Sequence, residues 1–91
     1  MDRTQLEARL VETFDADPDA ARIVARQASD LADSSQYVDD FDGELTVEIV
    51  LDNLGDAPDE DDLVERWNWW LGALELSHGG YQRFRVRPDV V

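Results

Sequence analysis

The 91-residue chain contains neither cysteine nor lysine. The absence of cysteine excludes disulfides, zinc–thiolate sites, iron–sulfur clusters and thiol catalysis. No run of about 18 apolar residues occurs, so the sequence predicts no membrane span. Residues 1–5 show no basic segment leading into an apolar one, and no secretory signal is expected. We therefore expect a cytoplasmic protein.

The chain is short and strongly acidic. It carries 22 acidic residues against eight arginines, a formal net charge of −14, and is 43% hydrophobic. That hydrophobic content is too high for a disordered tail, and the length suits one core but not two. The expected organisation is a single globular domain over residues 1–91.

The combination of arginine, abundant aspartate and no lysine is typical of adaptation to molar salt. There the Debye length falls to about 3 Å, and repulsion between exposed carboxylates is largely screened. The composition therefore predicts a halophilic protein. In a protein of this composition, an acidic run such as 59–62 is weak evidence for a cation site, because a solvated acidic surface explains it equally well.

Two acidic segments begin like calcium-binding loops and then depart from that pattern. In 15–26, Arg26 stands where the loop needs a bidentate glutamate. In the segment that contains Asp40-x-Asp42-Gly43, with Gly43 at the place of the loop glycine, Ile49 stands at that closing position. No phosphate-binding or dinucleotide-binding fingerprint occurs either. We expect no metal and no cofactor.

Apolar periodicity and end signals predict a mainly α fold. Apolar residues recur every fourth position over 6–14, Asp17 and Pro18 suit the start of a helix, and Gly79 suits an end. Segment 34–43 is expected to be a connector. The predicted elements are four helices, at about 4–14, 18–34, 46–54 and 60–76, and a short C-terminal β-strand at 81–87.

Segment 45–54 is ambiguous, because helical and strand periodicity each leave one apolar residue misplaced. Thr46 as an N-cap, Glu48 in the first turn and Gly55 at the end favour the helix. The β-branched content favours a strand. We favour the helix; the alternative is an α+β fold with 44–51 as a strand.

The fourth predicted helix carries three tryptophans on two faces. Trp67 and Trp70 share the main apolar face and are expected in the core. Trp69 lies off that face, together with Ala73 and Leu76, on a second apolar strip. Such a strip is either buried on a second side or an interaction surface, and tryptophan is common at interface hot spots.

Arginine is concentrated at the C-terminal end. Residues 66–91 hold four arginines and two acids, whereas residues 1–65 hold four arginines and 20 acids. The alternating Arg83, Arg85 and Arg87 would project from one face of the predicted strand, where they suit a nucleic acid or, alternatively, carboxylates of this chain or a second copy.

A strand at 81–87 needs a partner for its backbone groups. The candidates are 36–41, 45–51 if it is β, or the same strand of a second copy. Self-pairing would bring arginines together. We therefore expect pairing within the chain, with carboxylates of those segments neutralising Arg83 and Arg85.

His78 is the only histidine. It could act as a general base, but no serine or lysine partner stands at a recognisable spacing. A histidine at the end of a helix also interacts favourably with the negative end of the helix dipole. A small enzyme centred on His78 is therefore the third of the function hypotheses.

Three segments carry a family resemblance: Leu63-Val64-Glu65-Arg66-Trp67-Asn68-Trp69-Trp70, Gly79-Gly80-Tyr81 and Phe84-Arg85-Val86-Arg87. In these segments the chain resembles a family of small, acidic, uncharacterised haloarchaeal proteins. The resemblance implies a high-salt habitat and no particular chemistry.

The leading hypothesis is a non-enzymatic domain that binds another protein or its own copy. The alternative is a nucleic-acid-associated regulatory protein that uses Arg83, Arg85 and Arg87. The possible interaction surface comprises Trp69, Ala73, Leu76, Tyr81, Arg83 and Arg85.

Stability should depend on salt, because the 22 carboxylates repel one another when they are unscreened. We expect a higher melting temperature at about 3 M than at about 0.1 M KCl. Thermal melts followed by circular dichroism measure the difference. A melting temperature that is unchanged or lower at high salt would contradict the halophilic interpretation.

Overall fold

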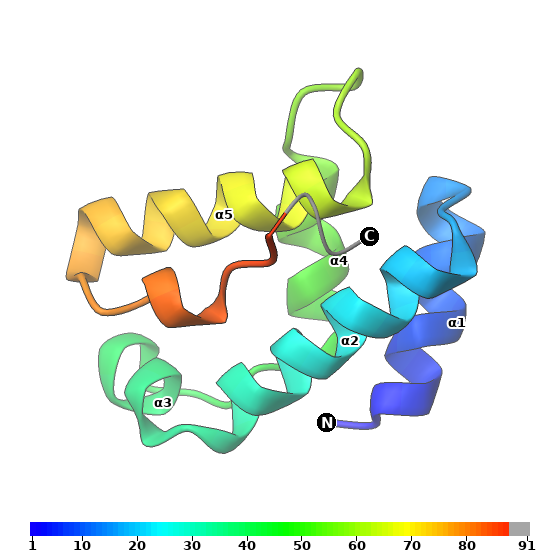
Figure 1. Cartoon of the computed structure of the whole chain (residues 1–91). Helices are drawn as coiled ribbons and strands as arrows, with labels where there is room; N and C mark the ends of the chain where they lie inside the picture. The colour runs from blue at the N-terminus through cyan, green and yellow to red at the C-terminus, as the bar shows by residue number, and fades with distance from the viewer. Residues whose placement is uncertain (88–91) are drawn as a thin grey trace.

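Residues 1–87 of the computed structural model are described, and they form five α-helices, one turn of 3-10 helix and no β-strand. None of these helices has the length and apolar character needed to cross a membrane. The elements are α1 (Arg3–Phe14), α2 (Pro18–Asp33), α3 (Ser35–Phe41), α4 (Val47–Gly55), α5 (Leu63–His78) and η1 (Gln82–Phe84) (Figure 1).

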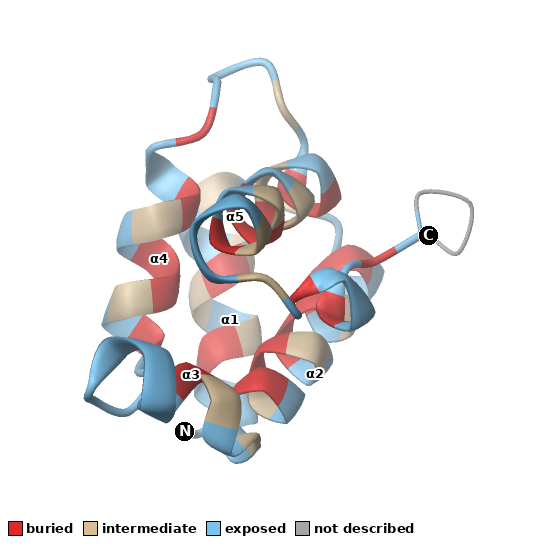
Figure 2. Ribbon diagram, turned by 90° about the vertical axis from the view of Figure 1, so that its left-hand side faces the viewer, coloured by how far each residue is buried: buried red, intermediate tan, exposed pale blue. Residues whose placement is uncertain are grey.

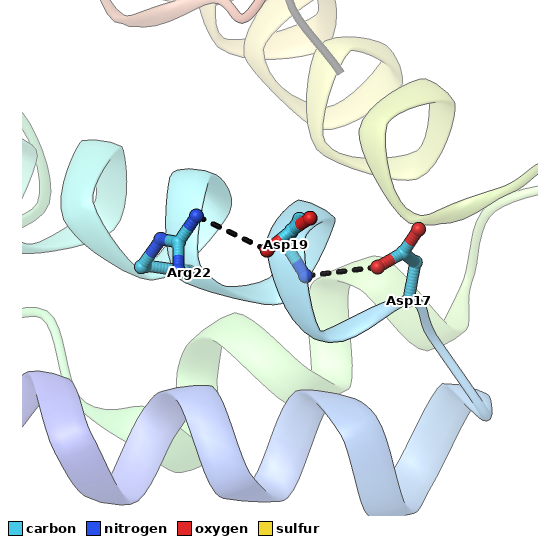
Figure 3. Close-up of polar contacts among 3 residues, drawn as sticks. All are labelled: Asp17, Asp19 and Arg22. Carbon is cyan, nitrogen blue, oxygen red and sulfur yellow. Dashed lines mark hydrogen bonds and ion pairs between the residues drawn. The ribbon is translucent and has the colours of Figure 1, made fainter.

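The first two helices begin at side-chain caps. The Asp2 carboxylate accepts from the backbone N–H of Gln5, and the Asp17 carboxylate accepts from that of Asp19. Asp19 also pairs with Arg22 at 3.1 Å, the one ion pair within residues 1–87 (Figure 3). Carboxylates at these positions satisfy free N–H groups and favour the positive helix end, so part of the acidic excess stabilises the helices.

Segment 47–55 is helical, which confirms the predicted helix and makes the α+β alternative wrong. The Thr46 hydroxyl accepts from the Ile49 N–H at 3.2 Å, as its N-cap position requires. The apolar residues then bury one face of the helix. They are Val47, Val50, Leu51 and Leu54.

Helix α5 begins at Leu63, three residues later than the predicted start at 60, and its N-cap is Asp62. The Asp62 carboxylate accepts from the Glu65 N–H at 2.8 Å, and the Glu65 carboxylate accepts from the Asp62 N–H at 2.9 Å. This reciprocal capping box fixes the first turn. At the other end the helix continues to His78, two residues beyond the predicted end at 76, and Gly79 is its C-cap.

Arg66 holds the loop before α5 against the end of α4. Its guanidinium donates to the backbone carbonyls of Leu54 at 3.0 Å, Asp61 at 3.1 Å and Asp59 at 3.3 Å. The same group lies over the Phe14 ring, 5.0 Å from its centre. These contacts keep residues 59–61 out of the helix, which explains its late start.

The predicted connector 34–43 contains helix α3, which the sequence analysis did not predict. The Gln36 amide donates to the Gly79 carbonyl at 3.0 Å, and Phe41 stacks on Tyr37 with ring centres 4.6 Å apart. The Tyr81 hydroxyl donates to Asp40 at 2.7 Å. The hydrogen bonds of Gln36 and Asp40 anchor α3 to the turn that follows α5.

The predicted strand 81–87 is wrong: the segment forms η1 and then an extended tail that pairs with no strand within residues 1–87. It returns along α5 and lies between α5 and α2 (Figure 1). Tyr81, Phe84 and Val86 are buried in the core formed by the inner faces of the helices (Figure 2).

Stability should fall as the pH rises above about 10. Burial, and then the hydrogen bond to Asp40, raise the pKa of Tyr81 well above its ordinary value of 10.0. The folded chain therefore keeps a proton that the unfolded chain has already lost, and this contribution to stability disappears at high pH. Chemical unfolding at about pH 9 and about pH 11 should show a smaller loss for Tyr81→Phe than for the wild type. Equal losses in the two proteins would contradict this role of Tyr81.

Candidate functional site

The tryptophans of α5 divide as the helical periodicity predicts. Trp67 is fully buried and Trp70 nearly so, and their rings meet edge to face with centres 5.6 Å apart. The Trp69 side chain is 42% exposed. Trp69 could have been buried on a second side of the helix or exposed, and in the structure it is exposed.

Trp67 and Asn68 hold the C-terminal segment through its backbone. The Trp67 indole donates to the Phe84 carbonyl at 2.8 Å. The Asn68 amide donates to the Val86 carbonyl at 2.7 Å, and its oxygen accepts from the Val86 N–H at 2.9 Å. Two side chains on one helix thus supply the hydrogen bonds that a neighbouring strand would otherwise make.

These bonds position Arg85. Phe84 and Val86, on either side of it, are both buried and both hydrogen-bonded to α5, so the Arg85 side chain lies on the outer surface. There it faces the exposed strip of α5 across an open groove of about 460 Å³. The residues that line the groove are Trp69, Gly72, Ala73, Glu75, Leu76, Gln82 and Arg85.

The charged residues of the groove differ in their partners. The Glu75 carboxylate accepts from the Tyr81 N–H at 3.0 Å, so it is part of the turn after α5. Arg85 is exposed and makes no ion pair with any carboxylate of residues 1–87. The predicted neutralisation of Arg83 and Arg85 by carboxylates of 36–41 or 45–51 is therefore wrong. Asp40 receives a hydrogen bond from Tyr81 instead.

The structure brings four of the six predicted surface residues together. Trp69, Ala73, Leu76 and Arg85 line one groove. Tyr81 is fully buried and offers no surface. Arg83 does not line the groove; its guanidinium lies 4.6 Å from the centre of the Phe84 ring, and it donates to the Gly80 carbonyl at 3.5 Å.

Three lining residues escaped the sequence analysis: Gly72, Glu75 and Gln82. Gly72 follows Trp69 by three positions, so the helical spacing that identified the exposed strip also places Gly72 beside it. Gln82 and Arg85 also stand three apart, which is the repeat of a 3-10 turn. The three-residue spacing of Gln82 and Arg85 has no meaning in a strand, so the strand prediction for 81–87 did not place them on one surface.

The His78 ring packs on Phe41, with ring centres 4.6 Å apart, and its imidazole takes part in none of the hydrogen bonds found within residues 1–87. No nucleophile or carboxylate is thus joined to it by a hydrogen bond in that part of the chain. In the same residues, no cluster of three potential metal-ligating side chains occurs.

A second hollow, of about 520 Å³, lies between the α1–α2 connection and the start of α5. Its lining contains apolar side chains, among them Phe14 and Leu63, and carboxylates that include Asp17, Asp62 and Glu65. All three carboxylates accept hydrogen bonds from backbone N–H groups at helix starts. They are therefore already used in capping.

The fold and the groove define a small helical domain whose tryptophan-rich helix builds one surface. The chain belongs to the WNWW domain family, whose model matches residues 1–75. The four letters of that name occur in this chain as Trp67-Asn68-Trp69-Trp70. This is a domain family of unknown function, in agreement with the resemblance to uncharacterised proteins. Comparisons with the curated proteins and with solved structures found no match.

Replacing Asn68 should destabilise the chain far more than replacing Trp69. Asn68→Ala leaves the N–H and carbonyl of the buried Val86 unpaired, at a cost of about 1–3 kcal/mol. Trp69→Ala truncates an exposed side chain and should cost less than about 1 kcal/mol. Denaturant unfolding at high salt measures both values.

Asn53→Ala is the matched control for Asn68→Ala, because the Asn53 amide makes one hydrogen bond, to the Ile49 carbonyl of its own helix. The Val86 amide should exchange with solvent faster in Asn68→Ala and not in Asn53→Ala. Equal stability of the two variants, with Val86 still protected, would show that Asn68 does not hold the segment.

Proposed function

We propose that this chain is a small non-enzymatic domain that binds another protein through the groove between α5 and the C-terminal segment. Within the tetrapeptide 67–70, three side chains have structural roles: Trp67 and Asn68 hold the C-terminal segment, and Trp70 packs in the core. Trp69 has no comparable role. Its exposure is the observation that carries the proposal.

The groove joins that indole to further apolar surface. Leu76 is 91% exposed, and Ala73 is exposed between it and Trp69. Isolated exposed apolar residues are common, whereas a contiguous apolar surface with polar residues beside it is typical of binding sites. Because tryptophan contributes strongly to interface energies, a partner that covers Trp69 gains the most from this surface.

Charge favours a different protein over a second copy. In molar salt the repulsion between two net charges of −14 is largely screened, so the charges that decide are those in direct contact in the groove. A symmetric dimer through this groove would bring Arg85 near the Arg85 of the second copy, because such interfaces pair the same surface with itself. The proposed partner is therefore another chain.

The proposed setting is a salt-rich cytoplasm. None of the charged side chains within residues 1–87 is buried, so the acidic excess lies on the surface. Short carboxylates there remain hydrated and solubilise the chain, while molar salt screens their repulsion. The same screening leaves the apolar contact as the main source of affinity.

Trp69→Ala should weaken partner binding at least about 30-fold, as expected for a hot spot of about 2 kcal/mol. A partner is first isolated on the immobilised protein at molar KCl and then purified for calorimetric titration. Phe41→Ala is the control, because Phe41 is an aromatic residue of similar exposure, 39%, on α3. Wild-type affinity in Trp69→Ala, or an equal loss in Phe41→Ala, would exclude the groove as the docking site.

A further inference from the structure

The two walls of the groove differ in chemistry. One wall is the apolar strip of α5, with Trp69 and Leu76 as its large exposed side chains. The other wall is the segment after α5, which contributes Gln82 and Arg85. An occupant therefore meets apolar surface on one side and a guanidinium on the other.

Arg85 stands in the C-terminal part of the chain, where cations outnumber acids. Residues 63–87 hold four arginines and two glutamates, whereas residues 1–62 hold four arginines and 19 acids. The other charged residue of the groove, Glu75, accepts a hydrogen bond from the Tyr81 N–H. Among the described residues, Arg85 has no carboxylate as an ion-pair partner.

We infer that the groove selects an acidic amphipathic segment of a partner protein, with an apolar side chain against Trp69 and Leu76 and a carboxylate on Arg85. This inference rests on the proposed function and names the chemistry of its partner. A guanidinium can bind a carboxylate through two parallel hydrogen bonds, which gives geometric selectivity as well as attraction. Arg85 is thus the specificity-determining residue.

The net charge of −14 does not prevent an acidic partner from binding at high salt. When the Debye length is about 3 Å, charges farther apart than a direct contact are screened. The distant carboxylates of residues 1–62 then contribute little repulsion. The guanidinium beside the groove still acts, because an ion pair in contact is screened least.

The backbone on both sides of Arg85 is held in place by α5. Phe84 and Val86 are bonded to α5 by the Trp67 and Asn68 side chains. The Arg85 backbone is therefore already ordered before a partner arrives, so only its side chain loses freedom on binding. Preorganisation of this kind increases affinity by lowering the entropic cost of association.

Two synthetic peptides of about 18 residues, long enough for partial helicity, test the inference. Both present leucines on one helical face; the other face carries glutamate in one peptide and lysine in the second. Anisotropy of the labelled peptides gives the affinities at about 3 M KCl, where the distant carboxylates are screened. We expect the glutamate peptide to bind at least about tenfold tighter than the lysine peptide.

Arg85→Gln should reduce that preference to less than about threefold, whereas Arg3→Gln, an exposed arginine on α1, should leave it unchanged. Trp69→Ala should weaken binding of both peptides. Equal affinities, a preference for lysine, no binding of either peptide, or no effect of Arg85→Gln would overturn the inference. So would binding of a labelled single-stranded oligonucleotide that depends on Arg85 when neither peptide binds.

The outcomes separate this inference from the proposed function. If the glutamate peptide fails to bind while a purified partner still binds in a Trp69-dependent manner, the groove is a docking site with a different selectivity. If Trp69→Ala affects neither the peptides nor the partner, both proposals fail.

Discussion

An extended backbone that leaves a helix and enters a protein core must find hydrogen-bond partners, and in this chain two side chains of one helix provide them. Trp67 binds the Phe84 carbonyl, and Asn68 binds both polar groups of Val86. Without these bonds the burial of Phe84 and Val86 would leave polar backbone groups unpaired, which is costly. The packing of the C-terminal segment on α5 depends on them.

The candidate groove is a consequence of the same contacts. Its first wall belongs to α5, and its second belongs to the segment that Trp67 and Asn68 hold. The tetrapeptide that matches the name of the family thus combines core packing, attachment of the chain end and an exposed indole at Trp69. The family match ends at residue 75, so Gln82 and Arg85 lie beyond it.

The excess of acidic residues contributes to the helices as well as to hydration of the surface. Carboxylates cap α1, α2 and α5, where they satisfy N–H groups and favour the positive helix ends. Others lie on the surface without an ion-pair partner in residues 1–87. An acidic composition is therefore compatible with well-defined helices, because some of its carboxylates stand where helices require them.

The segments that differ from the sequence predictions are those whose structure depends on distant contacts. Helix α3 has seven residues, too few for stability on local interactions alone. It is anchored through Gln36 and Asp40 to the turn after α5, which no local pattern reveals. The late start of α5 has a similar cause, because Arg66 binds carbonyls of the preceding loop.

The sequence by itself determined the features that short-range physics controls. Caps at Asp17 and Thr46 marked helix starts, and the 3.6-residue period placed Trp67 on the core face and Trp69 off it. That period left open whether Trp69 is buried on a second side, and the tertiary structure exposes it. The backbone of 81–87 also needs hydrogen-bond partners, as an extended segment does. Only the tertiary structure decided that those partners are side chains of α5 and not a strand, because a bond between residues 17 or 18 positions apart depends on how the chain turns back at Gly79. The same turn placed Arg85 opposite Trp69, which no periodicity could predict.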